Sequence, residues 1–201
     1  MPTLPLQRLE RPALIIVDMQ NDFLAERGCF AVSDPTKIIE ATRQLLAAFR
    51  KNDLPVFFTR HIYRTPSKDG GQTAAWWSID DSSDALREGT WHAELEGSLN
   101  PLKNEYVISK SRYSAFYATE LELLLRSERV KEVVICGVAT NVCCEATAHD
   151  AFFRDYPVFV VKDAMAGTTV AAHESTLTNL ALVYAHVVES DVVIRMLNRK
   201  E

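Results

Sequence analysis

Six short apolar runs alternate along the chain with segments in which apolar residues recur at helical spacing. The runs cover residues 13–19, 55–61, 105–110, 132–137, 157–163 and 186–190. The runs are rich in β-branched residues, and their apolar residues follow one another instead of alternating with polar ones. Strands that are buried on both faces of a parallel sheet have this composition. The pattern therefore predicts a six-stranded parallel sheet whose two faces are covered by helices.

Helices are predicted between these runs, at about residues 35–51, 118–127, 142–155 and 171–184. The first begins at Pro35, directly after two possible N-caps, Ser33 and Asp34, and carries a broad apolar stripe. The alternation of strands and helices predicts one three-layer α/β domain of the Rossmann-like type over residues 1–201, with right-handed crossovers. We see no linker or repeat that would divide the chain.

Residues 62–104 break the alternation, because their periodicity is weak and they contain three tryptophans. Long insertions in compact domains are usually functional or mobile. Trp77 and Trp91 are therefore candidates for the wall of a substrate cleft. A tryptophan in a loop more often only packs that loop against the core, and both interpretations stay open at this point.

Composition narrows the classes of partner. The chain has 201 residues, 47% of them hydrophobic, and a net charge of -5. Charges of both signs are mixed along the sequence, without the basic block that nucleic-acid binding requires. No apolar run reaches the ~20 residues of a membrane span, and the first residues, MPTLPLQRLERP, lack the apolar core of a signal peptide. We expect a cytoplasmic protein without nucleic-acid or membrane partners.

Four cysteines, at positions 29, 136, 143 and 144, are too few for a disulfide framework and lack the paired spacing of zinc sites. Reduced thiols are the expected state. Cys136 lies within the apolar run VVICG, which favours a buried and inert thiol. Cys143 lies instead where a predicted strand gives way to a helix.

Three reactive residue types occur where predicted strands end. Asp18 ends ALIIVD, Lys110 ends EYVISK and Cys143 follows the strand at 132–137. Ligands of open parallel sheets bind at the carboxyl ends of strands. A thiol at a helix N-terminus is expected to have a lowered pKa, a nearby carboxylate can accept its proton, and an ammonium group can hold the charges. Taken singly, Asp18 could be a helix cap and Lys110 a solvated flank.

Three longer segments carry a resemblance to a known family. IIVDMQNDF at 15–23, SKSRYSAF at 109–116 and GVATNVCCEATAHDAF at 137–152 resemble the isochorismatase-like cysteine hydrolases. The resemblance implies a six-stranded parallel sheet, with Asp18 as general acid/base, Lys110 as catalytic lysine and Cys143 as nucleophile. It also implies a cis peptide bond between Val138 and Ala139, an oxyanion hole made by the amides of Ala139 and Cys143, and no cofactor.

Differences within that family narrow the reaction. Isochorismatases themselves have a small residue at the nucleophile position, so Cys143 disfavours ether hydrolysis. Nicotinamidases resemble one another in an Asp-x-His metal segment after the second strand, whereas position 59 here is Thr and leaves His61 alone in FFTRHIYR. We therefore predict no metal.

TNVC followed by Glu145, together with GTWHAEL at 89–95, resembles ureidoacrylate hydrolases and carbamoyl amidases. Cys144 departs from the valine that is common in relatives. The resemblance implies hydrolysis of a small amide or carbamoyl (ureido) compound through a thioester intermediate, with release of ammonia or an amine. Alternatives are a nicotinamidase-type amidase, a catalytically silent small-molecule-binding protein on the same fold, and a redox protein that uses Cys143 and Cys144.

Two arginines near strand ends, Arg60 and Arg112, are candidates for binding a substrate carboxylate, since a guanidinium can bind one bidentately. Pairing of both arginines with surface acids is an equally good interpretation. The resemblance also favours a homo-oligomer in which a neighbouring subunit could close the cleft. The identity of the substrate stays open.

Overall fold

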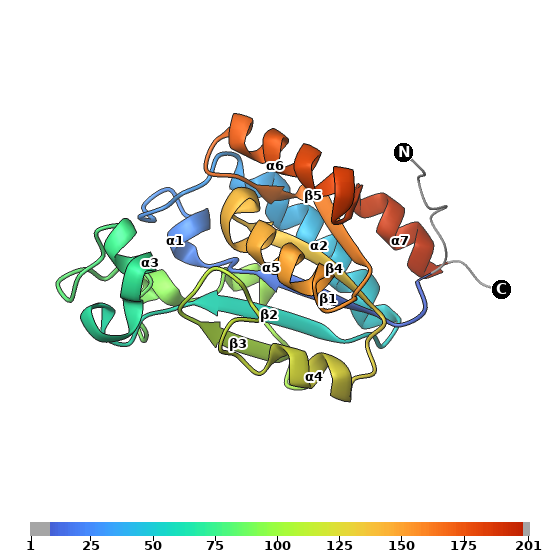
Figure 1. Cartoon of the computed structure of the whole chain (residues 1–201), viewed down its shortest axis with the longest axis horizontal. Helices are drawn as coiled ribbons and strands as arrows, with labels where there is room; N and C mark the ends of the chain where they lie inside the picture. The colour runs from blue at the N-terminus through green and yellow to red at the C-terminus, as the bar shows by residue number, and fades with distance from the viewer. Residues whose placement is uncertain (1–8, 199–201) are drawn as a thin grey trace.

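The computed structural model describes residues 9–198, and most of the N-terminal segment considered above lies outside this range. Six strands form one parallel sheet in the order β3-β2-β1-β4-β5-β6 (Figure 1). The prediction of a six-stranded parallel sheet is confirmed. The strands are β1 (Pro12–Val17), β2 (Val56–His61), β3 (Tyr106–Lys110), β4 (Glu132–Val138), β5 (Val158–Ala166) and β6 (His186–Val188).

Two separate apolar cores lie on the two faces of the sheet. Leu14 and Ile16 of β1 pack into the core that includes α2 (Pro35–Lys51) and α7 (Ser190–Asn198). Ala13, Ile15 and Val17 pack into the opposite core, which includes α4 (Leu121–Ser127), α5 (Glu145–Phe152) and α6 (Val170–Val183). Successive residues of a strand point to opposite faces. Burial on both faces therefore explains why the strand runs are continuously apolar.

Helix α2 spans the predicted residues, with Asp34 as the preceding residue and Pro35 in its first turn. The helix predicted from residue 142 begins instead at Glu145, because Thr140–Cys144 form a wider π-helical turn. The prediction missed α7. Ser190, at its first position, donates its hydroxyl to the Asp163 carboxylate and its N–H to the same group. Ser190 follows the end of β6 after a single residue, so the sequence pattern does not separate the short strand from the helix.

Residues 62–96 form a cap at the end of the sheet where the strands end, seen at the left of Figure 1, and the chain then returns past α2 to the start of β3. The segment contains α3 (Gly71–Trp76) and lies beside the short α1 (Asn21–Leu24). It has a small core of its own, formed by Tyr63, Ala74, Ile79, Ala85 and Leu86. Among residues 9–198, none of the helices has the length and apolar character that crossing a bilayer requires.

Candidate active site

The sheet order brings the three strand-end residues together. Strand β1 lies between β2 and β4, so Asp18, directly after β1, is flanked by the ends of both neighbours. Val17 is in register with Gly137 of β4, whose φ of 113° is favourable only for glycine. A Cβ atom at Gly137 would lie 2.1 Å from the Val17 carbonyl oxygen. Glycine at this position therefore permits the close approach of the two strand ends from which Asp18 and Cys143 extend.

Lys110 connects the other two members of the group. Its Nζ donates to Asp18 Oδ2 at 2.6 Å, to Cys143 Sγ at 3.4 Å and to the Arg112 carbonyl at 3.1 Å. The side chains of Lys110 and Asp18 are both fully buried. A buried ion pair is stable only where hydrogen bonds satisfy its remaining groups, and these contacts use all three donors of the ammonium.

Thr59 of β2 fixes the carboxylate from its other side. Its hydroxyl donates to Asp18 Oδ1 at 2.6 Å and accepts the Asp18 N–H at 3.1 Å. Asp18 has a φ of 50°, in the left-handed region that non-glycine residues rarely adopt. Such a conformation persists where surrounding contacts enforce it, and the paired bonds to Thr59 supply that constraint.

The protonation state of Cys143 differs from the sequence prediction. Burial raises the pKa of its thiol, the Asp18 carboxylate raises it further, and the charge of Lys110 lowers it only in part. The predicted lowering of this pKa was wrong, because desolvation outweighs the expected influence of a helix N-terminus. Burial alone would lower the pKa of Lys110, but Asp18 and Cys143 reverse this effect and raise it. The resting group is therefore a thiol beside a carboxylate–ammonium pair.

The backbone after β4 turns sharply toward the thiol. The peptide bond between Val138 and Ala139 is cis. The Ala139 carbonyl accepts the N–H groups of Val142 and Cys144 at 3.0 and 3.2 Å, which closes the π-helical turn around Cys143. Both Ala139 and Cys143 line the pocket described next.

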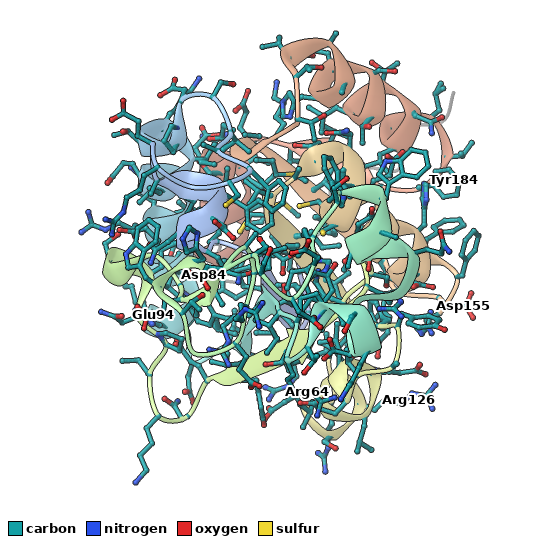
Figure 2. The ribbon with its side chains drawn as sticks, turned by 90° about the vertical axis from the view of Figure 1, so that its left-hand side faces the viewer. Arg64, Asp84, Glu94, Arg126, Asp155 and Tyr184 are labelled. Atoms are coloured by element: carbon teal, nitrogen blue, oxygen red, sulfur yellow. The ribbon has the colours of Figure 1, made fainter. Side chains whose placement is uncertain are left out.

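A pocket of about 280 Å³ opens between the cap and the group formed by Asp18, Lys110 and Cys143. It lies at the carboxyl ends of the strands, on the side of the molecule that faces the viewer in Figure 2. The labelled Arg64, Asp84 and Glu94 in Figure 2 belong to the cap. Within the described part of the chain, its wall has no lysine, arginine, aspartate or glutamate. The lining residues are Phe23, Cys29, Phe30, Ala31, His61, Tyr63, Trp77, Leu86, Tyr113, Ala139, Val142, Cys143 and Thr168.

The four predicted substrate-binding residues have different positions. Trp77 lines the pocket and donates its indole N–H to the Tyr113 hydroxyl at 3.0 Å. Trp91 does not line it, and the Arg27 guanidinium lies over its ring, with Cζ 3.8 Å from the ring centroid. Arg60 is also outside the lining, and its Nη2 donates to Ser109 Oγ at 3.4 Å.

Arg112, the fourth of these residues, fastens the cap instead of facing the pocket. Its Nη1 donates to the carbonyls of Asp69, Gly70 and Ser111 at 2.9, 3.2 and 2.6 Å. The bonds to Asp69 and Gly70 hold the chain directly before α3 against the end of β3, whereas the bond to Ser111 is local. The side chain of Arg112 therefore has a structural role in this geometry, and it is outside the lining of the pocket.

His61 is the pocket residue that the sequence reasoning undervalued. It is 3% exposed, its Nδ1 lies 4.0 Å from Cys143 Sγ, and its Nε2 lies 2.8 Å from the Tyr63 hydroxyl. Burial lowers the pKa of His61 well below its ordinary range, as do the charges of Lys110 and Arg112, so the ring is neutral. His61 is the last residue of β2. Inspecting the carboxyl ends of the strands, which selected Asp18, would therefore also have identified His61 as a candidate site residue.

Two groups of possible metal ligands lie near the pocket. Ligand atoms of Asp18, His61 and Cys143 all lie within 4.8 Å of one another, but the Lys110 ammonium is already bonded to two of these residues. A cation at the same place would be repelled by that charge, so this group fits a metal poorly. The second group, which the sequence reasoning did not identify, is Asp22, Cys29 and His92.

Comparisons with known proteins agree with this geometry. The family model for the isochorismatase domain matches residues 12–192. Nicotinamidase 3 of Arabidopsis thaliana is 35% identical, with 92% of this chain and 88% of the relative covered. A ureidoacrylate amidohydrolase of Serratia proteamaculans is 30% identical, over 90% of this chain and 81% of the relative. A cysteine hydrolase of Pseudomonas syringae superposes with a TM-score of 0.88 at 28% identity, covering 96% of this chain and 98% of that one.

Proposed function

The chain belongs to the isochorismatase family, and we propose that it is a cysteine-dependent amidohydrolase that cleaves the C–N bond of a small, uncharged, planar amide. One observation carries the proposal. A single buried lysine joins a carboxylate and a thiol, and that thiol faces a pocket in whose described wall no side chain is charged. The named amidohydrolases among the relatives support the reaction class.

The raised pKa of Cys143 defines what Asp18 must do. A thiol that is protonated at neutral pH needs a base at the moment of attack, and an Asp18 carboxylate oxygen lies within 4.8 Å of Sγ. We assign Asp18 as this base. As the proton moves from sulfur to carboxylate, negative charge moves in the opposite direction, and Lys110 stays bonded to both groups. The ammonium thereby stabilises the charge before and after the transfer.

The remaining steps follow from the same groups. The Cys143 thiolate attacks the amide carbonyl carbon, and the backbone N–H groups of Ala139 and Cys143 donate to the resulting oxyanion. Each such donor contributes about 3–4 kcal/mol to lowering the barrier. Protonated Asp18 gives its proton to the leaving nitrogen as the C–N bond breaks, which leaves a thioester. Asp18 then accepts a proton from the attacking water, the C–S bond breaks, and the proton returns to sulfur.

The pocket wall supports an uncharged substrate. A carboxylate in a pocket of this kind loses its hydration and needs a cationic donor in return. Neither predicted donor supplies one, since Arg60 lies outside the lining and Arg112 is bonded to carbonyls of the cap. Aromatic residues such as Trp77, Tyr113 and Phe30 offer flat faces to a planar group instead. An aromatic carboxamide of the nicotinamide type therefore fits better than an acidic ureido compound.

Ammonia release from a substrate panel tests the proposal. The panel is nicotinamide, benzamide, maleamate, ureidoacrylate, biuret and an N-carbamoyl amino acid, each also incubated with the Cys143→Ala variant. We expect the uncharged aromatic amides to give kcat/KM at least tenfold above the acidic compounds, and the variant to release no ammonia. A preference for ureidoacrylate would retain the amidohydrolase mechanism but overturn the uncharged substrate.

The competing interpretation, a silent binding protein on the same fold, predicts a different result. Such a protein would bind a panel compound, detected by calorimetry, without releasing ammonia. Absence of turnover across the panel, together with saturable binding of one compound, would overturn the enzymatic proposal. Peroxide-sensitive thiol titration with no amide turnover would indicate the redox alternative that uses Cys143 and Cys144.

A further inference from the structure

We propose that Asp22, Cys29 and His92 form a binding site for one zinc-like divalent cation at the rim of the pocket, separate from the catalytic group. The sequence-based expectation of no metal considered the segment around His61 and the spacing of the cysteines. The three rim residues come from three different parts of the chain: α1, the loop after it, and the 3-10 turn Trp91–Ala93. Only the folded structure brings them together.

The donor atoms have the type and spacing of a zinc site. A carboxylate oxygen, a thiol sulfur and an imidazole nitrogen lie within 4.8 Å of one another. Cys29 Sγ is 3.9 Å from His92 Nδ1, and His92 Nδ1 is 2.5 Å from Asp22 Oδ1. Ligands on a tetrahedral zinc lie about 3.3–3.6 Å apart, from Zn–N and Zn–O near 2.0–2.1 Å and Zn–S near 2.3 Å. Binding replaces the proton between His92 and Asp22 and moves these two atoms apart by about 1 Å.

The carboxylate is already oriented by backbone groups. Asp22 is fully buried, with Oδ1 accepting the Cys29 N–H at 3.0 Å and Oδ2 accepting the Leu86 N–H at 2.7 Å. These bonds fix the oxygen toward the sulfur and the imidazole, and they tie the Cys29 backbone to the same carboxylate. Bonds from other groups that orient a metal ligand are a regular feature of metal sites.

The charge at Asp22 favours a cation. Within residues 9–198, His92 is the only basic side chain that forms an ion pair with Asp22, and a histidine carries charge only when protonated. A buried carboxylate without a permanent positive partner is costly. A divalent ion would neutralise the carboxylate and convert the thiol into a thiolate ligand.

Solvent reaches the three ligands through Cys29. Cys29 is exposed and lines the same pocket as Cys143. Three protein ligands plus one open position are typical of zinc that binds a water molecule or an exchangeable ligand. The site would thus connect α1, the following loop and the cap at the pocket rim. At Cys143, the lysine bonded to the thiol disfavours a cation. Among the described residues, no lysine is bonded to Cys29.

Cobalt substitution tests the site without reference to turnover. The protein is stripped with a chelator and titrated with Co²⁺, whose thiolate charge-transfer band reports a bound cysteine. Variants Cys29→Ser and Cys143→Ser remove one candidate thiolate each, and His92→Gln removes the nitrogen ligand. Circular dichroism verifies that each variant is folded. Asp22 is left intact because its carboxylate also holds two backbone amides.

We expect one Co²⁺ per chain, a band that is lost in Cys29→Ser and kept in Cys143→Ser, and at least tenfold weaker binding in His92→Gln. Zn²⁺ should displace Co²⁺ and abolish the band. Absence of a band in the wild-type protein at millimolar Co²⁺ would overturn the proposal. A band that is kept in Cys29→Ser, or lost in Cys143→Ser, would also overturn it. Because the readout is spectroscopic, its failure is distinct from a failure of the proposed amidohydrolase activity.

Discussion

Cys143 and Cys29 line the same pocket, yet their surroundings lead to different chemistry. Cys143 is buried and bonded to a lysine that also holds the Asp18 carboxylate. Cys29 is exposed and lies near a carboxylate and an imidazole, with no lysine bonded to it among the described contacts. A resident ammonium group supports transient thiolate formation and repels a metal. Its absence leaves the other site suited to a cation. We infer that the charge next to each thiol, more than the thiol itself, determines the role proposed for it.

The largest expected effect is on turnover in Cys143→Ala. The covalent step should disappear, and the rate of amide hydrolysis should fall by about four orders of magnitude or more. Cys136→Ala is the matched control, because Cys136 belongs to the core on the opposite face of β4. Its pKa is raised to about 12 by burial, so it is an inert thiol. Substantial activity in a verified Cys143→Ala preparation would remove covalent catalysis by this residue.

Asp18→Asn and Lys110→Ala should each reduce kcat by about three orders of magnitude, because proton transfer from sulfur needs both groups. The residues act as a unit, so the double variant should be little slower than the poorer single one. Single-turnover measurements on folded variants provide the comparison. Losses that multiply would mean that Asp18 and Lys110 act in separate steps, contrary to the shared hydrogen bond at 2.6 Å.

The same pair should also affect stability. Lys110→Met leaves the buried Asp18 carboxylate without its partner, and the free energy of unfolding should fall by about 3–5 kcal/mol. Adding Asp18→Asn should recover part of that loss, since the uncompensated charge is then gone. Denaturant titration of the two single variants and the double variant measures this coupling. Equal destabilisation by Lys110→Met with and without Asp18→Asn would show that the ion pair contributes no specific energy.

His61 offers a test of pH dependence. Its pKa in the folded protein lies well below the ordinary value of 6.5, so below pH 6.5 the unfolded chain binds a proton that the native chain does not. Stability should therefore fall as pH decreases, by about 1.4 kcal/mol per pH unit from this group alone. His61→Gln should flatten the decline between pH 6.5 and 5. His173→Gln, at a partly buried histidine whose pKa burial also lowers, should flatten it less.

The smallest effect concerns Trp77, an aromatic residue in the wall of the pocket. Trp77→Ala should raise KM for an aromatic amide by about tenfold, with a smaller change in kcat, because a flat apolar contact is lost. Trp76→Ala is the matched control, since Trp76 is 78% exposed and does not line the pocket. Steady-state kinetics with nicotinamide and with an aliphatic amide separate the two. An equal rise for both variants would place the aromatic contact elsewhere.

Much of the fold was predictable because the burial of a strand determines the residue types in its own short segment of sequence. Strands covered on both faces must be apolar at nearly every position, and this fixed the six strands within a few residues. The rule that parallel strands end at one edge then selected Asp18, Lys110 and Cys143, which the structure brings within bonding distance. The same rule would have selected His61, but a single histidine carries too little local signal to separate a pocket residue from a loop residue.

The sequence by itself determined the order of the six strands and of four helices between them, the family resemblance and the three reactive residue types. Tertiary structure alone decided which tryptophan faces the pocket, that Arg112 holds the cap, and that the Cys143 pKa is raised. It also joined Asp22 to Cys29 and His92, which are 7 and 70 residues away along the chain. These properties depend on burial and on charges from distant segments. Such long-range terms leave no periodic or adjacent pattern in the sequence.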